Sequence, residues 1–413
     1  MKRYEEEGKK DGPKNGSALY AYVGAWASDL HMDGEEQEAN GGIRIYTVDR
    51  EIGKLQLTGQ VSKDINAGIL CISKDGRYLY SVDERKDRGK IPGAGGGVYS
   101  YQIRQEDGLL QPLNSQSSAG AFPCYTAIDP KGEFLFASNH GHHFDIASKT
   151  IKDIEGECHV ERIFDDGSAV MFPLNEDGSL APASYVDVLS GSSVNPIYQN
   201  SPHPHSIHVD ANGRFVIVCD KGTDQIRVYR IDRQKRCLHP MEPAYKAKNG
   251  SGPRHLAFHP RADYIFVNSE LDSTVHSYHF KEGKIEEICS VRTIPADYQP
   301  VDPQDHFAAN FTADIQIHPS GRFLYVTNRG AESIAAFRVL EESGRLELIG
   351  YYDACGRVPR ALRIMPGGKF LFVVNQRSGN IIRFCIDGET GELSRGEEVL
   401  KLPNPVCMRF LER

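Results

Sequence analysis

An arginine and a glutamate stand at the two ends of one strand-like stretch, SGPRHLAFHPRADYIFVNSELDST (251–274). Arg254 begins a first apolar run, and Glu270 ends a second one sixteen residues later. The runs are joined by a short polar segment, so the stretch predicts a β-hairpin. The start of the first strand of a hairpin lies beside the end of the second, so the two residues are expected to be neighbours. A guanidinium can hold a carboxylate or a phosphate, and a carboxylate can move a proton, so the pair is a candidate for ligand binding or catalysis.

The same hairpin pattern recurs along the chain. Complete copies begin at residues 67, 122, 203, 252, 311 and 358, and a further copy begins at residue 404 and stops after one strand. Each complete copy has an alternating apolar run, a polar turn usually of the D/P-x-G-R/K type, and a second apolar run. Third and fourth strand-like runs often follow, and most copies are 46 to 59 residues apart. Four strands per repeat at this spacing predict a β-propeller.

The two ends of the chain complete this pattern. The segment 404–413 supplies one strand, and the segments 18–24, 41–49 and 54–62 supply three. Together they make a seventh blade, which removes the exposed sheet edges of an open ring. The sequence therefore predicts an all-β fold: a single seven-bladed β-propeller domain over residues 18–413, with four-stranded antiparallel blades. The polar segment 1–17 is expected to be a disordered tail.

Aligned positions of the other hairpins are expected to lie near Arg254 and Glu270, at one rim of the central channel. The first strand of each blade lines the channel of a propeller, so the strand starts form one ring and the ends of the second strands form another. The first ring holds Ile69, Cys124, His205, Arg254, Ala313 and Arg360. The second ring holds Glu84, His140, Lys221, Glu270, Arg329 and Gln376. So many charged side chains at one rim predict a pocket for a small anionic ligand.

Roles within these rings follow from side-chain chemistry, although polar residues in a water-filled channel can also be structural. We predict that His205, Arg254, Glu270 and Arg329 are catalytic. We predict that Glu84, His140, Lys221, Arg360 and Gln376 bind substrate. By contrast, His259, His318, Arg77, Arg214 and Arg322 recur in the turns at the opposite end, where they are expected to serve the turns. His255 is expected to be a polar residue between blades.

One spacing between copies is longer than the rest, at 81 residues. The excess, at about 140–167, is predicted to be an insertion between the second and third strands of its blade. A loop of this length is usually functional or disordered. Its histidines, His140, His142, His143 and His159, match no metal-ligand spacing, so no metal site is predicted. A role over the substrate is expected for those near the rim.

Bulk composition excludes several other classes of protein. The net charge of −8 argues against nucleic-acid binding, and no apolar run approaches the roughly 18 residues of a membrane span. The N-terminus has no apolar core of a signal peptide, and most of the nine cysteines lie in strand-like runs, such as Cys71, Cys219, Cys289 and Cys385. We therefore expect buried free thiols, a cytoplasmic location, no cofactor, and a monomer or a weak homo-oligomer.

Several motifs together resemble one known family. They are PHPH (202–205), GPRHLAFHP (252–260), NSELDSTV (268–275), TADIQIHPSGRFLYVTNR (312–329) and VPRALRI (358–364). With these motifs the chain resembles the lactonase seven-bladed propeller family, which includes the propeller-type 6-phosphogluconolactonase and carboxy-cis,cis-muconate cyclase. The resemblance covers residues 18–413 and implies a site at the channel mouth with His205, Arg254, Glu270 and Arg329. Two departures concern the pocket: Pro-Cys-Tyr at 123–125, where relatives often have a histidine, and the long insertion.

The resemblance implies hydrolysis of a small anionic sugar lactone, such as a phosphosugar lactone. A base must then activate water, and donors must stabilise the oxyanion. Glu270 or His205 is the expected base, Arg254 and Arg329 the expected donors. Lys221 and Arg360 are suited to a phosphate. Two alternatives stay open: a muconate-type lactonising cycloisomerase that binds a polycarboxylate, and a propeller that binds a ligand or a protein without catalysis.

Overall fold

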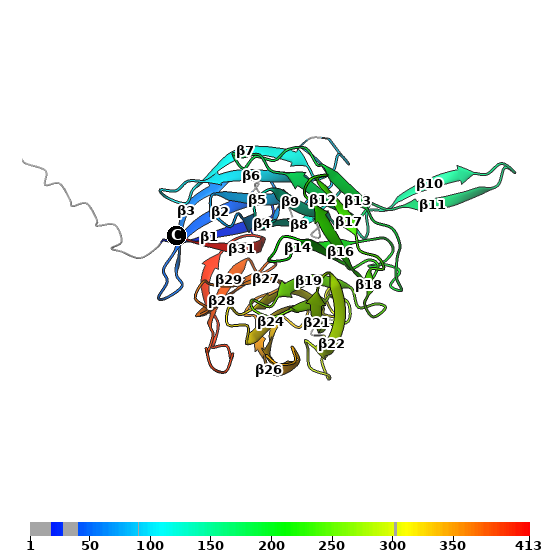
Figure 1. Cartoon of the computed structure of the whole chain (residues 1–413). Coiled ribbons are helices and arrows are strands. Elements are labelled where there is room, and N and C mark those ends of the chain that lie inside the picture. Colours follow the sequence, from blue (N-terminus) through cyan, green and yellow to red (C-terminus); the bar gives the residue numbers. More distant parts are fainter. Residues whose placement is uncertain (1–17, 28–39, 90, 301–303) are drawn as a thin grey trace, which may run out of the picture.

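Seven antiparallel β-sheets surround one channel in the computed structural model of the chain, which describes residues 18–27, 40–89, 91–300 and 304–413 (Figure 1). The tail expected at 1–17 lies outside the described residues. Within the described ranges, no helical segment has the length and hydropathy that a membrane crossing by a helix would need. The all-β seven-bladed propeller predicted from the repeats is confirmed.

Six blades follow one another along the chain, each numbered here from its innermost strand outward. The first three are β4 (Ala67–Ile72), β5 (Tyr78–Asp83), β6 (Gly97–Ile103) and β7 (Leu110–Ser117); β8 (Pro123–Ile128), β9 (Phe134–Asn139), β12 (Ser168–Pro173) and β13 (Tyr185–Val188); and β14 (Pro204–Val209), β15 (Phe215–Asp220), β16 (Gln225–Asp232) and β17 (Cys237–Pro240). The next three are β19 (Pro253–Phe258), β20 (Tyr264–Ser269), β21 (Thr274–Lys281) and β22 (Lys284–Arg292); β23 (Phe311–Ile317), β24 (Phe323–Arg329), β25 (Ser333–Val339) and β26 (Leu346–Asp353); and β27 (Pro359–Ile364), β28 (Phe370–Asn375), β29 (Asn380–Cys385) and β30 (Glu397–Lys401). The third blade departs from four strands, because the short β18 (Tyr245–Lys246) also pairs with β16.

The seventh blade closes the ring, as the sequence predicted. Its innermost strand is the C-terminal β31 (Pro405–Glu412), followed outward by β1 (Leu19–Ala25), β2 (Gly42–Val48) and β3 (Leu55–Val61). Each innermost strand contacts the next one around the ring, and β27 and β4 both contact β31. The two ends of the propeller are therefore joined by strand pairing.

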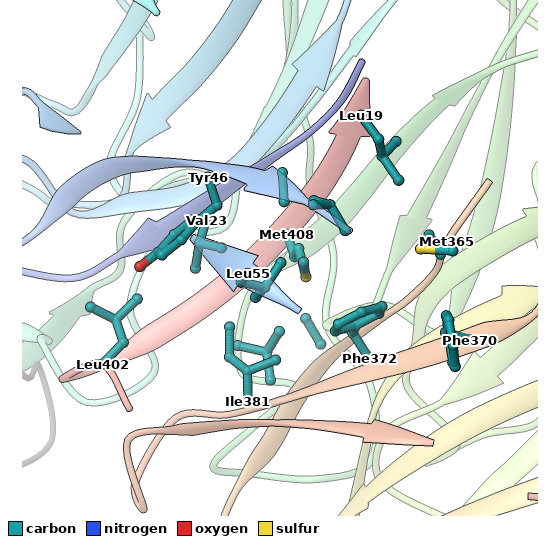
Figure 2. Packing of buried hydrophobic residues seen from close by; sticks show 14 of the residues in the cluster. Leu19, Val23, Tyr46, Leu55, Met365, Phe370, Phe372, Ile381, Leu402 and Met408 are labelled. Atoms are coloured by element: carbon teal, nitrogen blue, oxygen red, sulfur yellow. The ribbon is translucent and has the colours of Figure 1, made fainter. Parts of the chain in front are cut away.

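Apolar side chains fill the spaces between neighbouring blades. Figure 2 shows the cluster between the sixth and seventh blades, where Phe372 and Ile381 face Val23, Leu55 and Met408. All five side chains are buried. Such clusters pack neighbouring blades against each other and so fix the positions of the rim residues.

A β-bulge recurs at the rim end of the innermost strands. In four blades a proline opens the strand, and the pairing register shifts across the next residue, which is Cys124, His205, Arg254 or Arg360. A proline lacks an N–H for the ladder and is tolerated at a strand start, and a bulge re-aims the side chain that it carries. The bulge therefore places His205, Arg254 and Arg360 at the channel mouth.

A buried polar residue at the end of the second strand of most hairpins fixes the second ring of rim residues. Asp83, Asn139, Asp220, Asn328 and Asn375 each come directly before a rim residue. Asp220 Oδ1 accepts a hydrogen bond of 2.8 Å from the backbone N–H of His203, and Asn139 Nδ2 donates one of 2.8 Å to Ser118 O. These bonds tie the end of each second strand to the segment that enters the same blade.

The insertion between β9 and β12 forms a hairpin of β10 (Ala147–Lys152) and β11 (Cys158–Ile163), which projects away from the blades (Figure 1). Its strands are largely exposed. Lys86 forms ion pairs of 2.7 Å with Asp145 and 2.8 Å with Asp165, so it ties both legs of the hairpin to the first blade. The base of the insertion is thus fixed at the rim, and its tip is far from it.

The expectation of buried thiols holds only in part. Cys219 is buried, but Cys71 and Cys289 are half-buried and Cys385 is exposed, because it ends the third strand of its blade. None of the nine cysteines, all within the described residues, forms a disulfide.

Candidate functional site

A pocket of about 240 Å³ opens at the channel mouth, where the two rings meet. All nine residues predicted to be catalytic or to bind substrate line this pocket. They are His205, Arg254, Glu270, Arg329, Glu84, His140, Lys221, Arg360 and Gln376. The structure therefore brings the whole predicted set together, while their individual roles stay predictions.

Glu270 is the centre of a buried cluster of charges. Its Oε2 atom lies 2.8 Å from Arg254 Nε, and its Oε1 atom lies 3.3 Å from Lys221 Nζ and 3.2 Å from Arg329 Nη2. The side chains of all four residues are at most 8% exposed. The neighbours expected from the hairpin geometry, Arg254 and Glu270, are in direct contact.

These contacts set the protonation states of the cluster. Burial opposes the ionised carboxylate of Glu270, but Lys221, Arg329 and Arg254 together hold its pKa well below the usual range. Burial lowers the pKa of Lys221 to about 8, although Glu270 acts in the opposite direction. Glu270 is therefore a stable anion that orders three cations, and it has little tendency to accept a proton.

A second ion pair crosses the mouth from the sixth blade to the first. Arg360 Nη2 lies 2.9 Å from Glu84 Oε1 and 3.1 Å from Glu84 Oε2. The guanidinium also stacks over the ring of Trp26, with 4.4 Å between Cζ and the ring centroid. Burial raises the pKa of Glu84, and Arg360 limits this rise. The two pocket carboxylates thus have pKa values shifted in opposite directions.

His205 lies beside two other histidines at the pocket. Its ring centroid lies 5.0 Å from that of His140 and 5.2 Å from that of His255. Burial and the charge of Arg254 hold its pKa well below 6.5, so the imidazole is neutral at pH 7. Its buried Nδ1 atom has no hydrogen-bond partner among the described residues. Of the two expected bases, His205 is the one that is neutral and forms no ion pair with the pocket cations.

His255 next to Arg254 has a structural role, as expected. Its Nδ1 atom donates to Asp314 Oδ1 at 2.9 Å, and its Nε2 atom accepts from Arg254 Nη1 at 3.1 Å. Asp314 belongs to the next blade, so the imidazole links two innermost strands. Through this chain of contacts, Asp314 helps to orient Arg254.

An aromatic wall completes the pocket, and the repeat alignment missed it. Tyr198 comes from the segment before β14, and Phe307 comes from the segment before β23. Phe307 packs under the guanidinium of Arg329 at 5.0 Å and under that of Arg377 at 5.7 Å. The other lining residues outside the two rings are Trp26, Phe122, Gly141, His142, His143, Phe144, His306, Phe311 and Val358. The only sequence signal for this wall is the length of the segments between blades.

The pocket carries an excess of positive charge. Its lining contains five cationic side chains, those of Lys221, Arg254, Arg329, Arg360 and Arg377, and two carboxylates. Arg377 is paired with Asp305 at 2.7 Å, behind the lining. A site of this kind favours a ligand with two or more negative charges.

Comparison with known proteins agrees with the fold. The family described as Lactonase, 7-bladed beta-propeller, matches residues 21–410. A protein of Bacillus subtilis (strain 168) named 6-phosphogluconolactonase is 30% identical over 374 residues, which cover 90% of this chain and 95% of that protein.

Two solved structures resemble the whole chain. A putative 6-phosphogluconolactonase of Bacteroides fragilis has a TM-score of 0.78 and 27% identity, and the match covers 97% of this chain and 100% of that one. A periplasmic gluconolactonase of Pseudomonas aeruginosa, PpgL, has a TM-score of 0.78 and 26% identity, and the match covers 95% of this chain and 99% of that one. The compartment named for that protein differs from the cytoplasmic location expected here, which stays a prediction.

Proposed function

Because this chain belongs to the lactonase seven-bladed β-propeller family, we propose that it hydrolyses a small anionic sugar lactone of the 6-phosphogluconolactone class in the pocket at the channel mouth. The observation that carries the proposal is the set of cations ordered around Glu270 beside the neutral His205. Relatives with the name 6-phosphogluconolactonase supply the substrate class.

The first step is attack of water on the lactone carbonyl. His205 accepts a proton from this water, and the oxygen adds to the carbonyl carbon. Arg254 and Arg329, fixed by Glu270, face the carbonyl oxygen and stabilise its developing negative charge. In the second step the ring C–O bond breaks, and the protonated His205 returns the proton to the leaving alkoxide. The product is an open-chain hydroxy acid.

Substrate charge is held by the remaining cations. Lys221 carries three N–H donors, of which Glu270 takes one, so it can also meet a phosphate oxygen. Arg360 is suited to the same phosphate from the other side of the mouth, where it lies over Trp26. Lys221 and Arg360 then hold the phosphate end of the lactone, and Arg254 and Arg329 hold its carbonyl end.

The test is hydrolysis of a lactone panel, followed as acid release. The panel contains 6-phosphogluconolactone, unphosphorylated gluconolactone and a carboxylated muconolactone. We expect the phosphorylated lactone to have the highest kcat/KM, and we expect His205→Asn to lower its turnover by about 10²–10⁴-fold. The matched control is His259→Asn, because His259 lies at the opposite end of a hairpin. Wild-type turnover by a folded His205→Asn protein would exclude His205 as the base.

The aromatic wall supports one second candidate. Phe122, Phe307 and Phe311 offer flat faces to a planar unsaturated acid, and the same cations would bind two or three carboxylates. A muconate-type cycloisomerase would interconvert the muconolactone of the panel with an open polyacid and leave the phosphosugar lactone unchanged. If no panel member reacts but sugar phosphates bind, the pocket serves a binding protein instead.

A further inference from the structure

Three histidines gather at the wall of the pocket, although His203 is far from His140 and His143 in the sequence. His140 ends the second-blade hairpin, His143 begins the insertion, and His203 precedes β14. One ring nitrogen of each lies within 4.8 Å of the corresponding nitrogens of the other two. His140 and His143 line the pocket, and His203 is buried behind them. His159, at the far hairpin, is exposed on β11 and is not part of the group.

Backbone carbonyls determine where the lone pairs of two of these rings lie. His203 Nδ1 is 2.7 Å from His140 O, and His140 Nδ1 is 2.8 Å from Gly141 O. A carbonyl oxygen only accepts, so each Nδ1 carries the hydrogen and each Nε2 carries a lone pair. A backbone carbonyl that receives one ring N–H while the other nitrogen stays available is the usual arrangement of a metal-binding histidine.

The lone pair of His203 Nε2 faces a group of polar atoms. This nitrogen lies 3.3 Å from Asn200 Oδ1, and the Asn200 amide is oriented by its Nδ2–H, which donates to His143 O at 3.4 Å. Ser201 Oγ at 3.4 Å and His143 Nδ1 at 3.0 Å can each supply a hydrogen to His203 Nε2 when no ion is bound. Burial lowers the pKa of His203 to about 3, so the ring holds no extra proton at pH 7.

The other two rings also offer unused nitrogens. The Nε2 atoms of His140 and His143 are buried without a hydrogen-bond partner among the described residues. A neutral His143 ring has one lone pair, and its Nδ1 atom, 3.0 Å from His203 Nε2, is the one that can share an ion with His203. Two nitrogens bound to one tetrahedral Zn²⁺ at about 2.0–2.1 Å lie about 3.4 Å apart, so this pair and the Asn200–His203 pair both have nearly the spacing of metal ligands.

We propose that His140, His143 and His203, with Asn200 Oδ1 beside them, bind one borderline divalent cation, Zn²⁺ in the first place, at the wall of the substrate pocket. Neutral imidazoles suit this class of ion. Because two of the three ligands line the pocket, a remaining coordination position is open to an anionic group of the ligand. The inference goes beyond the proposed function, because it needs only the binding of the ion.

A neighbouring cation opposes the ion. The charge of Lys221 lowers the pKa of all three histidines, so it acts on the site itself. Removal of this charge in Lys221→Met is therefore expected to tighten Zn²⁺ binding.

The test is metal binding by the full-length protein after treatment with a chelator. Co²⁺ is added first, because its visible absorption reports a nitrogen-rich site of low coordination number, and Zn²⁺ is then used to displace it. We expect one ion per chain and loss of the Co²⁺ bands as Zn²⁺ enters. His143→Gln is expected to weaken Zn²⁺ binding by about 100-fold, while His142→Gln, one residue away, binds as the wild type does.

Three outcomes would overturn the site: no ion bound by the wild type, more than one equivalent bound with no visible bands, or equal losses in His142→Gln and His143→Gln. Thermal melting of each variant shows whether it is folded, and His140→Gln is the second variant if His143→Gln is not. Lactone hydrolysis is measured separately. If the protein binds Zn²⁺ but hydrolyses no lactone, the metal site is supported and the proposed function is excluded. If it hydrolyses a lactone but binds no Zn²⁺, the proposed function is supported and the metal site is excluded.

Discussion

The hairpins of the six complete repeats have a turn end and a rim end, and the two ends use polar residues differently. At the turn end, the residue after the first strand caps the turn in one blade after another. Asp129 Oδ1 accepts from the N–H groups of Glu133 and Phe134 at 2.7 and 2.9 Å, and Asp210 Oδ1 accepts from those of Arg214 and Phe215, both at 2.6 Å.

Histidine performs the same task in two other blades. His259 Nδ1 accepts from the N–H groups of Arg261 and Ala262 at 3.1 and 2.9 Å, and His318 Nδ1 accepts from that of Ser320 at 3.1 Å. The arginines of these turns repeat one contact as well: Arg77, Arg214 and Arg322 each lie over the aromatic ring of the next residue, at 5.1 to 5.3 Å. The interpretation of these residues as turn chemistry is confirmed.

At the rim end, aligned positions carry different residues that contact one another across blades. Arg254, Lys221 and Arg329 come from three blades and share one carboxylate. Polar residues that recur at the turn end of several blades therefore serve the backbone of their own blade, whereas the set at the rim end, which differs from blade to blade, serves the channel. The following predictions test this division, from the largest expected effect to the smallest.

Removal of the charge at Glu270 is expected to have the largest effect. In Glu270→Gln three buried cations lose their counter-ion and Arg254 and Arg329 are no longer fixed toward the carbonyl oxygen, so we expect kcat/KM to fall by about 10²–10³-fold. We expect the free energy of unfolding to fall by about 3–5 kcal/mol. Lactone kinetics and urea denaturation measure the two effects.

The matched control for this variant is at the turn end. Glu282 forms an exposed ion pair of 2.9 Å with Arg214, so Glu282→Gln should change neither activity nor stability measurably. Equal behaviour of the two variants would contradict the division between the ends.

Asp210→Ala tests the turn end. The carboxylate is buried and accepts backbone N–H groups that then lose their partner, so the free energy of unfolding should fall by about 1–3 kcal/mol. The kcat/KM of the folded protein should stay at the wild-type value. Denaturation curves and kinetics under conditions of full folding check this, and a loss of activity in folded protein would show that the turn end contributes to the site.

Lys221 should make ligand binding depend on pH. Its pKa of about 8 means that the ammonium is charged below pH 8 and loses its charge above it. The affinity for 6-phosphogluconate, the product of the proposed reaction, should therefore be about tenfold weaker at pH 9 than at pH 7. Calorimetric titration measures this without the spontaneous hydrolysis that lactones undergo in alkali.

Lys221→Arg provides the comparison, because a guanidinium remains protonated through this range. Its affinity should show no decline between pH 7 and 9. A decline of the same size in both proteins would assign the titration to another group.

The fold could be predicted from the sequence because each blade repeats the same pattern of apolar alternation and turn residues. Ring closure could be predicted too, since one strand after residue 404 and three strands between residues 18 and 62 form one complete blade. Both inferences rest on local periodicity, which needs no knowledge of side-chain contacts.

The rim could be predicted as a set of residues but not as an arrangement. Alignment selected Arg254 and Glu270, yet the bulge that turns Arg254 into the mouth has no signature beyond the preceding proline. The aromatic wall and the approach of His203 to His140 and His143 were not predictable. They depend on segments between blades and on the base of the insertion, where the chain follows no repeat.

The mouth of the pocket can close only after β31 has paired with β1. Glu84 of the first blade and Arg360 of the sixth lie on the two sides of the closing blade, so their ion pair spans the seam of the ring. Most residues of the pocket are synthesised long before β31, but the channel has no closed mouth until that strand docks against β1 and β4. Without β31 the seventh blade lacks its innermost strand, so the ring of blades and the mouth of the pocket stay open.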